Sequence, residues 1–383
     1  MHRMESGFLQ NQVSMIRFLD LKKINERYET AFQDKLKSVL KSGWYILGKE
    51  VETFETNFAS YCKAQHCVGV GNGLDALTLI FKAYIQLGKL QKGNEVIVPA
   101  NTYIATILAI LAADLVPVLV EPKLETYNIN PDLIPEKITP KTKAILAVHL
   151  YGQLAEIERI HTIAEQNDLL VIEDAAQAHG IERNSNFEIP NSKTKLWARA
   201  YSFYPSKNLG ALGDGGAVVT NDAPLAKVIQ SLRNYGSETK YQNEFVGVNS
   251  RLDEIQAAFL NLKLSNLDTD NEKRRRIVKR YLTEIKNDKI ILPFWDFSKN
   301  HVFHLFVIRT SKRAELQAFL QQHGIETAIH YPIPPHKQKA LENMNALSFP
   351  ITEKIHEEIL SLPLNPALED EEVSAIIKAL NEY

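Results

Sequence analysis

The sequence predicts an α/β protein built around a mainly parallel β-sheet, and two observations lead to this fold class. Short segments rich in Val, Ile and Leu alternate with helical segments over roughly the first 220 residues, as in successive βαβ units. These apolar segments show little alternation of polar and apolar residues, which is typical of strands buried on both faces. With 383 residues, the chain is long enough for a large domain and a smaller second one.

Two helices are expected before the alternating part of the chain begins. Apolar residues at helical spacing predict a helix over Leu19–Leu40, which Gly43 ends, and another over Val51–Tyr61. The strands that follow are expected at Cys67–Val70, Glu95–Pro99, Val116–Val120, Ala144–His149, Leu169–Glu173, Ala198–Tyr204 and Ala217–Thr220. The helices between them are expected at Leu74–Leu87, Thr102–Ala113 and Leu154–Asn167.

The C-terminal third of the chain is expected to form the smaller domain. Arg251–Ile285 is a long helical stretch, with a break near Asn266–Asp270, that leads into it. Beyond this stretch we expect a strand and three helices, at Val302–Arg309, Arg313–His323, Ile351–Leu360 and Asp370–Leu380. We therefore divide the chain into an extension or tail (1–14), a large domain (15–262) and a small C-terminal domain (263–383).

Composition excludes several classes of protein. The net charge is −2 and the basic run Lys273–Arg276 lies in a helical pattern, where it is expected to be a solvated helix face, so nucleic acid is not an expected partner. No run of 18 apolar residues predicts a membrane span, and residues 1–14 lack the apolar core of a signal peptide. Cys62 and Cys67 with one neighbouring histidine provide too few ligands for a structural zinc site. We expect a cytoplasmic protein without a metal centre.

The stretch from Tyr201 to Thr220 contains the residue best suited to covalent chemistry. A strand stops at Pro205, Lys207 follows, and a glycine-rich loop leads into the next strand. Glycines let the backbone approach a bound group, and a lysine at a strand end can lose solvent and act as a nucleophilic amine. On these residues alone, a hairpin with a solvated lysine is the more frequent explanation, so the other strand ends must decide.

Asp174 directly follows the predicted strand over Leu169–Glu173. A carboxylate there is desolvated and requires a cationic or hydrogen-bonding partner, and a protonated pyridine nitrogen meets that requirement. Gln177 is three residues further on and can donate to a phenolate oxygen from the same face. The alternative for Asp174 is an N-cap of the following turn.

Two further strand ends provide a helix start and an aromatic ring. Gly71–Leu77 opens a helix, whose free N–H groups favour a phosphate, and Ser202 offers a hydroxyl to the same group. The segment has G-x-G spacing without the third glycine of a dinucleotide fingerprint, and it has no P-loop Lys-Ser/Thr. Tyr103 follows another strand end, where its ring can stack on a planar cofactor or can simply be a packed tyrosine.

A lysine, a carboxylate, a phosphate-binding helix start and a stacking ring together indicate pyridoxal 5′-phosphate. Lys207 would form the Schiff base and Asp174 would hold the pyridinium, with the cofactor acting as an electron sink. In a parallel sheet these strand ends lie at one edge, so the four parts are expected to meet. A dinucleotide-binding oxidoreductase is the competing enzyme class, and the missing third glycine and ribose-binding acid weaken it.

From about Met15 to the C-terminus, the chain resembles the StrS/DegT-type sugar aminotransferases. The resemblance rests on the segments GNGLDAL, PANTYIAT, EDAAQAHG, SFYPSKNLGALGDGGAVVT, GVNSRLDEIQAA and IHYPIPPH. It implies the aspartate-aminotransferase fold (fold type I), with a seven-stranded sheet in the large domain. It also implies that Lys207 carries the cofactor, that Asp174 pairs with the pyridine nitrogen, and that Gln177 pairs with the ring oxygen.

The resemblance extends to the remaining cofactor contacts and to a second subunit. Tyr103 would stack on the ring, and a phosphate site would form from Gly73, Leu74, Asp75 and Ser202, the middle two through their backbone. Asn249 matches an asparagine that reaches the phosphate of the other subunit, so the resemblance implies a homodimer with shared active sites.

Within the family, the chain is most similar to the 3-aminotransferases of dTDP-3-oxo-6-deoxyhexoses. The resemblance puts Tyr204, Arg251, His330 and Tyr331 near the sugar, L-glutamate as the amino donor, and a dTDP-3-amino-3,6-dideoxyhexose as the product. Relatives with histidine at the lysine position perform dehydration, so Lys207 supports transamination. Ser206 departs from a frequent glycine but keeps a small residue.

Two alternatives stay open at this point. One is an aminotransferase that acts at C4 or on another nucleotide-linked oxo-sugar. The other is a non-enzymatic regulator on the same fold, against which the intact Lys207, Asp174 and Gln177 argue. Glu182–Lys195 matches the family poorly and is expected to be a surface loop.

Overall fold

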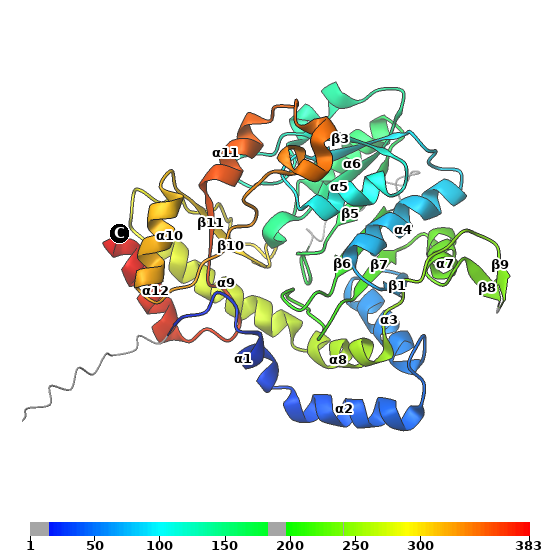
Figure 1. The fold of residues 1–383 in the computed structure, drawn as a ribbon, viewed down its shortest axis with the longest axis horizontal. Helices are drawn as coiled ribbons and strands as arrows, with labels where there is room; N and C mark the ends of the chain where they lie inside the picture. The colour runs from blue at the N-terminus through cyan, green and yellow to red at the C-terminus, as the bar shows by residue number, and fades with distance from the viewer. Residues whose placement is uncertain (1–14, 183–196, 240) are drawn as a thin grey trace, which may run out of the picture.

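A seven-stranded sheet lies at the centre of the protein, in a computed structural model that describes residues 15–182, 197–239 and 241–383. Its strands are β1 (His66–Val70), β2 (Glu95–Pro99), β3 (Val116–Val120), β4 (Thr142–Val148), β5 (Leu170–Asp174), β6 (Trp197–Ser202) and β7 (Gly216–Thr220). The strand order is β1-β7-β6-β5-β4-β2-β3, and only β7 runs antiparallel to its neighbours. The mainly parallel seven-stranded sheet predicted from the sequence is confirmed (Figure 1).

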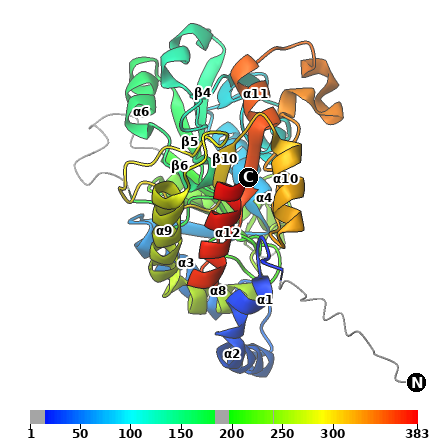
Figure 2. The same ribbon diagram turned by 90° about the vertical axis from the view of Figure 1, so that its left-hand side faces the viewer.

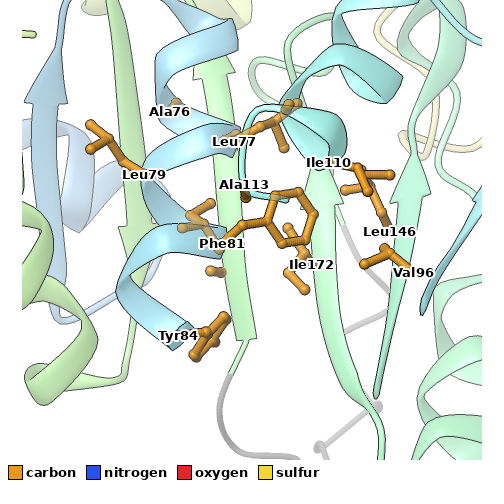
Figure 3. Close-up of a cluster of buried hydrophobic side chains, with 14 of the residues drawn as sticks. Ala76, Leu77, Leu79, Phe81, Tyr84, Val96, Ile110, Ala113, Leu146 and Ile172 are labelled. Carbon is orange, nitrogen blue, oxygen red and sulfur yellow. The ribbon is translucent and has the colours of Figure 1, made fainter. Parts of the chain in front are cut away.

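One face of the sheet is covered by three apolar helices. Phe81 and Tyr84 lie fully buried on the central helix of this group, and Figure 3 shows Phe81 among side chains of the neighbouring strands such as Leu146 and Ile172. Each strand contributes alternate residues to this face, so the helices need a broad apolar surface to cover it. The three helices are α4 (Gly73–Gln86), α5 (Ile104–Leu111) and α7 (Ala223–Leu232).

The opposite face of the sheet is covered by helices that are apolar on one side only. Phe54 and Phe58 bury one side of the first helix against Phe203, at the end of β6. Ile160 and Ala164 do the same for the helix that packs on β4 and β5. The helices on this face are α3 (Lys49–Tyr61), α6 (Ile157–Gln166) and α8 (Glu254–Leu264).

The C-terminal part has its own hydrophobic core and lies beside the large sheet (Figure 1), and its helices face the viewer in Figure 2. A two-stranded antiparallel sheet pairs Phe306 with Leu362 and packs between helices. Ile16, from the N-terminal end of the described chain, joins this core and forms a bridge with Ile325. The elements here are α9 (Leu267–Glu284), β10 (Phe306–Arg309), α10 (Arg313–Gln322), α11 (Pro350–Glu358), β11 (Ile359–Leu362) and α12 (Asp370–Glu382).

Short elements complete the described chain. A small hairpin near residue 240 consists of β8 (Ser237–Thr239) and β9 (Gln242–Asn243). Single 3-10 turns occur at Pro131–Leu133, Pro135–Lys137, Leu150–Gly152, Pro335–Lys337 and Lys339–Met344. No described helix has the combined length and apolar composition that crossing a membrane requires.

The helix predicted over Leu19–Leu40 is two helices, α1 (Leu21–Glu26) and α2 (Glu29–Ser42). The break comes where the Arg27 guanidinium pairs with Asp270 of α9, while Tyr28 is buried. Apolar spacing continues through this point, so local periodicity gives no sign of a break that a distant partner causes.

Other predictions also need correction, and one helix was not predicted. The strand expected over Val302–Arg309 begins only at Phe306. The helix expected to run to Leu360 ends at Glu358, and the next four residues form β11, because pairing with β10 completes the small sheet. The run Lys273–Arg276 is not a solvated face, because Arg274 and Arg275 are buried and donate to backbone carbonyls. Helix α7 was not predicted at all, although Asp222 caps its N-terminus. The loop expected at Glu182–Lys195 falls almost entirely outside the described residues.

Candidate active site

The carboxyl ends of six parallel strands meet at one edge of the sheet, and the sequence motifs lie there. Gly216 begins the antiparallel strand β7 at the same edge, opposite Val70 of β1 and Ser202 of β6. The helix start after β1, the ring after β2, the carboxylate of β5 and the lysine after β6 are thereby collected on one side. This is the edge where α/β sheets of this kind bind ligands.

A cradle forms where α4 begins, because two glycines allow close backbone approach. A Cβ on Gly216 would lie 2.4 Å from the carbonyl carbon of Asn72, and one on Gly73 would lie 2.7 Å from Cβ of Ser202. A side chain at Gly216 would push the helix start away from β7, and one at Gly73 would push it away from β6. The first N–H groups of α4 have no carbonyl partner within the helix, which makes this end suited to an anion beside the Ser202 hydroxyl.

Hydrogen bonds hold the start of α4 in place. Asn72 caps the helix, with its Oδ1 accepting from the Asp75 N–H at 2.8 Å. The Asp75 carboxylate accepts from the Ser250 hydroxyl at 2.6 Å, and that hydroxyl also accepts from the Gly71 N–H at 3.0 Å. Ser250 therefore ties the cradle to the segment that precedes α8.

Asp174, the last residue of β5, is buried, with 8% of its surface exposed. Its Oδ1 accepts from the Ala176 N–H at 3.1 Å, and its Oδ2 accepts from the Thr106 hydroxyl at 2.9 Å. Burial raises the pKa of this carboxyl above its ordinary value, while these two donors act in the opposite direction. Among the described residues, no lysine or arginine forms an ion pair with Asp174, although the nearby Lys207 amine also acts to lower the pKa of this carboxyl.

Lys207 lies in the tight turn after β6, where its backbone N–H bonds to the Tyr204 carbonyl at 2.8 Å. Burial lowers the pKa of its amine to about 8, and the nearby Asp174 acts in the opposite direction. A substantial fraction of the amine is then neutral near physiological pH, as nucleophilic and base chemistry requires. Within the described chain, Nζ makes no hydrogen bond.

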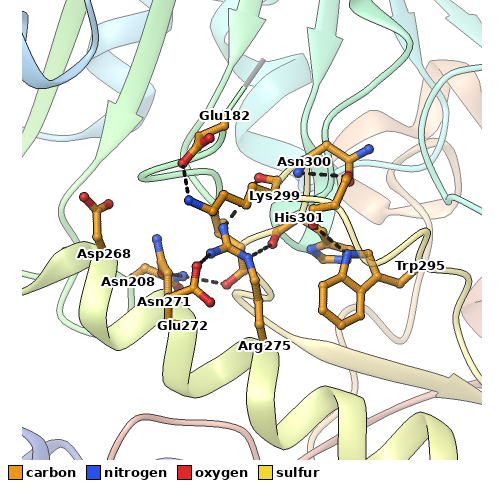
Figure 4. Close-up of polar contacts among 12 residues, drawn as sticks. Glu182, Asn208, Asp268, Asn271, Glu272, Arg275, Trp295, Lys299, Asn300 and His301 are labelled. Carbon is orange, nitrogen blue, oxygen red and sulfur yellow. Dashed lines mark hydrogen bonds and ion pairs between the residues drawn. The ribbon is translucent and has the colours of Figure 1, made fainter. Parts of the chain in front are cut away.

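The residue after this lysine anchors the turn to the C-terminal part. The Asn208 side-chain amide donates to Asn271 Oδ1 of α9 at 2.8 Å and to the Val302 carbonyl at 3.0 Å (Figure 4). Its Oδ1 lies 3.2 Å from Nδ1 of His304, which therefore carries the proton at that position. Sequence analysis missed Asn208 and His304, because neither lies at a strand end.

Gln177 has a fixed orientation in the site. Its Oε1 accepts from the Tyr151 N–H, so the amide nitrogen is turned the other way, and it donates to the Tyr331 hydroxyl at 3.2 Å. A second proton on that nitrogen remains available to an acceptor. Tyr331 in turn contacts the ring of Tyr103, with ring centroids 4.9 Å apart, and the Tyr103 ring is 50% exposed.

Of the four residues assigned to the sugar, His330 and Tyr331 lie close to the cofactor residues, because Tyr331 bonds to Gln177. His330 is held by Ser361, 2.9 Å from its Nδ1, and by its ring contact with Phe18. Burial lowers the pKa of His330 to about 4, and the neighbouring Lys207 acts in the same direction. The structure thus brings His330 near the lysine, while the carbonyl of the exposed Tyr204 accepts from the backbone N–H of Lys207.

Asn249 and Arg251 lie on the segment that Ser250 ties to the cradle. The Asn249 side chain is exposed, and within the described chain it makes no hydrogen bond. Arg251 donates to Asn234 Oδ1 at 2.8 Å and its guanidinium lies over the Tyr235 ring. Neither side chain contacts Lys207 or Asp174 of its own chain.

A second ionic cluster lies beneath the site and was missed by sequence analysis. Glu173 is fully buried; its Oε2 lies 3.1 Å from Nε of Arg199 and 2.8 Å from Nε2 of His149. The Ala155 N–H donates to Nδ1 of His149, so the imidazole proton is on Nε2 and points to Glu173. Successive side chains of a strand point to opposite faces of the sheet, so Glu173 lies on the face opposite to that of Asp174.

These residues fit pyridoxal 5′-phosphate. A buried carboxylate without an ion pair among the described residues suits a protonated ring nitrogen, a helix start beside a serine suits a phosphate, and an amine of lowered pKa suits the aldehyde. The exposed Tyr103 ring offers a face for stacking. No group of histidine, cysteine and acidic side chains that could hold a metal ion occurs in the described part of the chain.

Comparisons with known proteins agree with this fit. A family model described as the DegT/DnrJ/EryC1/StrS aminotransferase family matches residues 26–381. The chain is 56% identical over 369 residues to the dTDP-3-amino-3,6-dideoxy-alpha-D-galactopyranose transaminase of Aneurinibacillus thermoaerophilus, covering 96% of this chain and 99% of that protein.

Two solved structures share the fold over nearly the whole chain. S. venezuelae DesV in complex with a ketimine intermediate has a TM-score of 0.90 and 43% identity, with 96% of this chain and 98% of that chain covered. NtdA from Bacillus subtilis with bound cofactor PMP has a TM-score of 0.88 and 32% identity, with coverages of 97% and 86%.

Proposed function

The chain belongs to the DegT/DnrJ/EryC1/StrS aminotransferase family and is a pyridoxal-phosphate-dependent aminotransferase, and from this premise we propose its substrates. The amino group moves from L-glutamate to C3 of a dTDP-3-oxo-6-deoxyhexose and gives a dTDP-3-amino-3,6-dideoxyhexose. The observation that carries this proposal is the 56% identity, over almost the full length of both chains, to a transaminase named for such a sugar.

Lys207 performs the proton transfers in this proposal. When bound, the cofactor supplies an electron sink for the charge left by proton removal. The Lys207 amine, with a pKa of about 8, takes the proton from the carbon that bears the donor's amino group and later delivers one to C3 of the sugar. Asp174 would hold the positive charge of the ring nitrogen, and Gln177 would donate to the ring oxygen with the amide proton that its bond to Tyr331 leaves free.

Three residues orient the sugar. We assign Tyr204, His330 and Tyr331 to this role. The exposed Tyr204, the proximity of His330 to Lys207 and the bond between Tyr331 and Gln177 support this assignment. His330 is neutral at physiological pH, since its pKa is about 4, so its ring presents hydrogen-bonding nitrogen atoms and no charge. Holding the ketone in one orientation against the amine supplies much of the rate.

The direct test is incubation with L-glutamate and, in separate reactions, the galacto and gluco forms of dTDP-3-oxo-6-deoxyhexose. Mass and NMR analysis of the product is expected to give an amino group at C3 of at least one of them. Amination of a 4-oxo-sugar or a UDP-linked sugar in preference to both would establish the alternative substrate. Absence of any amino transfer from glutamate to an oxo-sugar would reject the proposal.

We also propose a homodimer in which Asn249, with Arg251 beside it, reaches the neighbouring subunit's site. Its exposed side chain, on the segment that Ser250 ties to the cradle, supports this assignment. Mixing Lys207→Ala with Asn249→Ala protein gives mixed dimers with one doubly defective and one intact site. After proven subunit exchange, activity is expected to reach roughly a quarter of the wild type, because half of the dimers are mixed. No gain over the parents would contradict shared sites.

The remaining assignments follow the same line. We place the enzyme in the cytoplasm, where the free thiols of Cys62 and Cys67 are stable, and in the biosynthesis of deoxyamino sugars for O-antigen or another polysaccharide. We keep a large domain over 15–262 and a small one over 263–383, which the separate C-terminal core supports, with Ile16 reaching across to that core.

A further inference from the structure

Two buried threonines connect to Asp174, and neither has a part in the function described so far. Thr102 and Thr106 have 2% and 0% of their surfaces exposed, and their hydroxyl oxygens lie 2.7 Å apart. Thr106 Oγ1 lies 2.9 Å from Asp174 Oδ2. A chain of hydroxyl groups thus runs from the beginning of α5 to the carboxylate at the end of β5.

The chain of hydroxyls has one direction when Asp174 is ionised. A carboxylate only accepts, so the single Thr106 proton lies on the contact with Asp174. The contact between the two threonines must then use the Thr102 proton, with Thr106 as acceptor. Hydroxyls that donate in sequence polarise one another, so the last donor is strengthened by the first.

These donors also fix how the carboxylate is turned. Thr106 bonds to Oδ2 and the Ala176 N–H bonds to Oδ1, so the two oxygens are held from different sides. Each oxygen keeps lone-pair capacity for one further donor. Tyr103 is the N-cap residue of α5, which also contains Thr106. The start of this helix therefore positions both the Tyr103 ring and the Asp174 carboxylate.

We propose that Thr106 is a positioning residue that keeps Asp174 ionised and turned toward the ring nitrogen of the cofactor, with Thr102 orienting the Thr106 hydroxyl. Without the hydroxyl, the buried carboxylate becomes a stronger base, and the proton shared with the ring nitrogen moves toward Asp174. The ion pair then becomes a neutral pair, and the ring loses electron-withdrawing power. This inference rests on the cofactor site and is independent of which sugar is the substrate.

The test is the 15N NMR signal of pyridoxal 5′-phosphate labelled at the ring nitrogen and bound to the protein, compared among variants at one pH. Thr106→Val keeps the shape and removes the donor, and its signal is expected to shift toward that of an unprotonated pyridine. Affinity for pyridoxamine 5′-phosphate is expected to fall about tenfold, as for the loss of one hydrogen bond to a charged group. Thr106→Ser is expected to restore both readouts.

A matched control comes from another buried threonine that donates to a carboxylate. Thr352 Oγ1 lies 2.6 Å from Glu121 Oε2 at the start of α11, and neither side chain bonds to Asp174 or Lys207. Thr352→Val is therefore expected to leave the 15N signal unchanged. Thr102→Val is expected to shift the signal in the same direction as Thr106→Val, but by less.

The possible outcomes separate this inference from the cofactor assignment. If the wild type does not bind the cofactor, both are overturned. If all variants bind it and Thr106→Val gives the wild-type 15N signal, the inference alone is wrong. Thr106→Ala replaces the valine variant if the latter does not fold, with the same expected shift.

Discussion

Two neighbouring carboxylates on β5 are both buried, but they differ in the hydrogen-bonding and charged partners that the chain provides. Glu173 receives a guanidinium from Arg199 and the Nε2–H of His149. Asp174 receives only a hydroxyl and a backbone amide, and within the described chain it forms no ion pair, although the Lys207 amine lies nearby. A buried charge is costly unless it is paired, so the missing ion-pair partner is what a ligand must supply.

Two lysines repeat this contrast. Burial lowers the pKa of both Lys207 and Lys263 to about 8. Lys263 donates to the Gly210 carbonyl and to Asn25 Oδ1, whereas Lys207 makes no hydrogen bond to another described residue. A shifted pKa therefore does not distinguish a catalytic group from a structural one, and the set of partners does.

The largest expected effect is the loss of turnover when Lys207 is replaced. Lys207→Ala removes the amine that carries the protons, so turnover with glutamate is expected to fall by at least about 10³-fold. The variant keeps the cradle at α4 and is expected to bind pyridoxamine 5′-phosphate with an affinity within about tenfold of the wild type. Steady-state kinetics and equilibrium binding measure the two quantities. A variant with near wild-type turnover would show that Lys207 is only a part of the turn.

The second-largest effect is expected for Asp174, on the rate of the half-reaction with glutamate. Asp174→Asn keeps the shape but cannot balance a positive charge on the ring nitrogen, so we expect a loss of about 10²-fold in the half-reaction with glutamate. Stopped-flow absorbance of the cofactor measures this rate. An unchanged rate, with the cofactor bound, would mean that Asp174 is only a cap.

Replacing Glu173 is expected to lower the stability of the protein. Glu173→Gln leaves the Arg199 guanidinium buried without its carboxylate, which is expected to lower the free energy of unfolding by about 3 kcal/mol. The control is Glu182→Gln, because Glu182 pairs with Lys299 on the surface and its removal is expected to cost less than about 1 kcal/mol (Figure 4). Urea denaturation of the three proteins compares these costs. Equal losses for the two variants would remove the distinction between the carboxylates.

Much of the fold was predictable, because burial on both faces leaves continuous apolar runs. Each of the seven strands of the large sheet was expected within about two residues of where it lies. The errors arose where a distant partner decides the local structure. Asp270 breaks the N-terminal helix at Arg27, and β10 turns the residues after Glu358 into a strand.

The residues proposed to bind the cofactor could be predicted from the sequence, but the residues that hold those side chains in place could not. Lys207, Asp174 and Gln177 stand out, because reactive side chains directly after apolar strands are unusual. Thr106 and Arg199 do not stand out, because threonine and arginine are common and their partners are distant in the sequence. The spacing of Thr102 and Thr106, four residues apart after a strand end, is the one local sign of their contact.

The smallest effect concerns how the free energy of unfolding of the cofactor-free protein varies with pH. Burial raises the folded-state pKa of Asp174 above its ordinary value of 3.8, so the folded protein binds this proton more tightly than the unfolded chain. The contribution of Asp174 to stability therefore falls as pH rises from about 3.8 through the folded-state pKa, and it stays at its lowest level above that.

Asp174→Asn removes this dependence, so the variant is expected to gain stability relative to the wild type as pH rises across this window. The gain is about 1.4 kcal/mol for each pH unit that separates the folded-state pKa from the unfolded-state pKa. Thermal unfolding of both proteins at a series of pH values measures the difference. For Glu173, whose countercharge the chain itself provides, no such gain is expected from removing the carboxylate. A constant difference between Asp174→Asn and wild type at all pH values would mean that Asp174 is as well compensated as its neighbour.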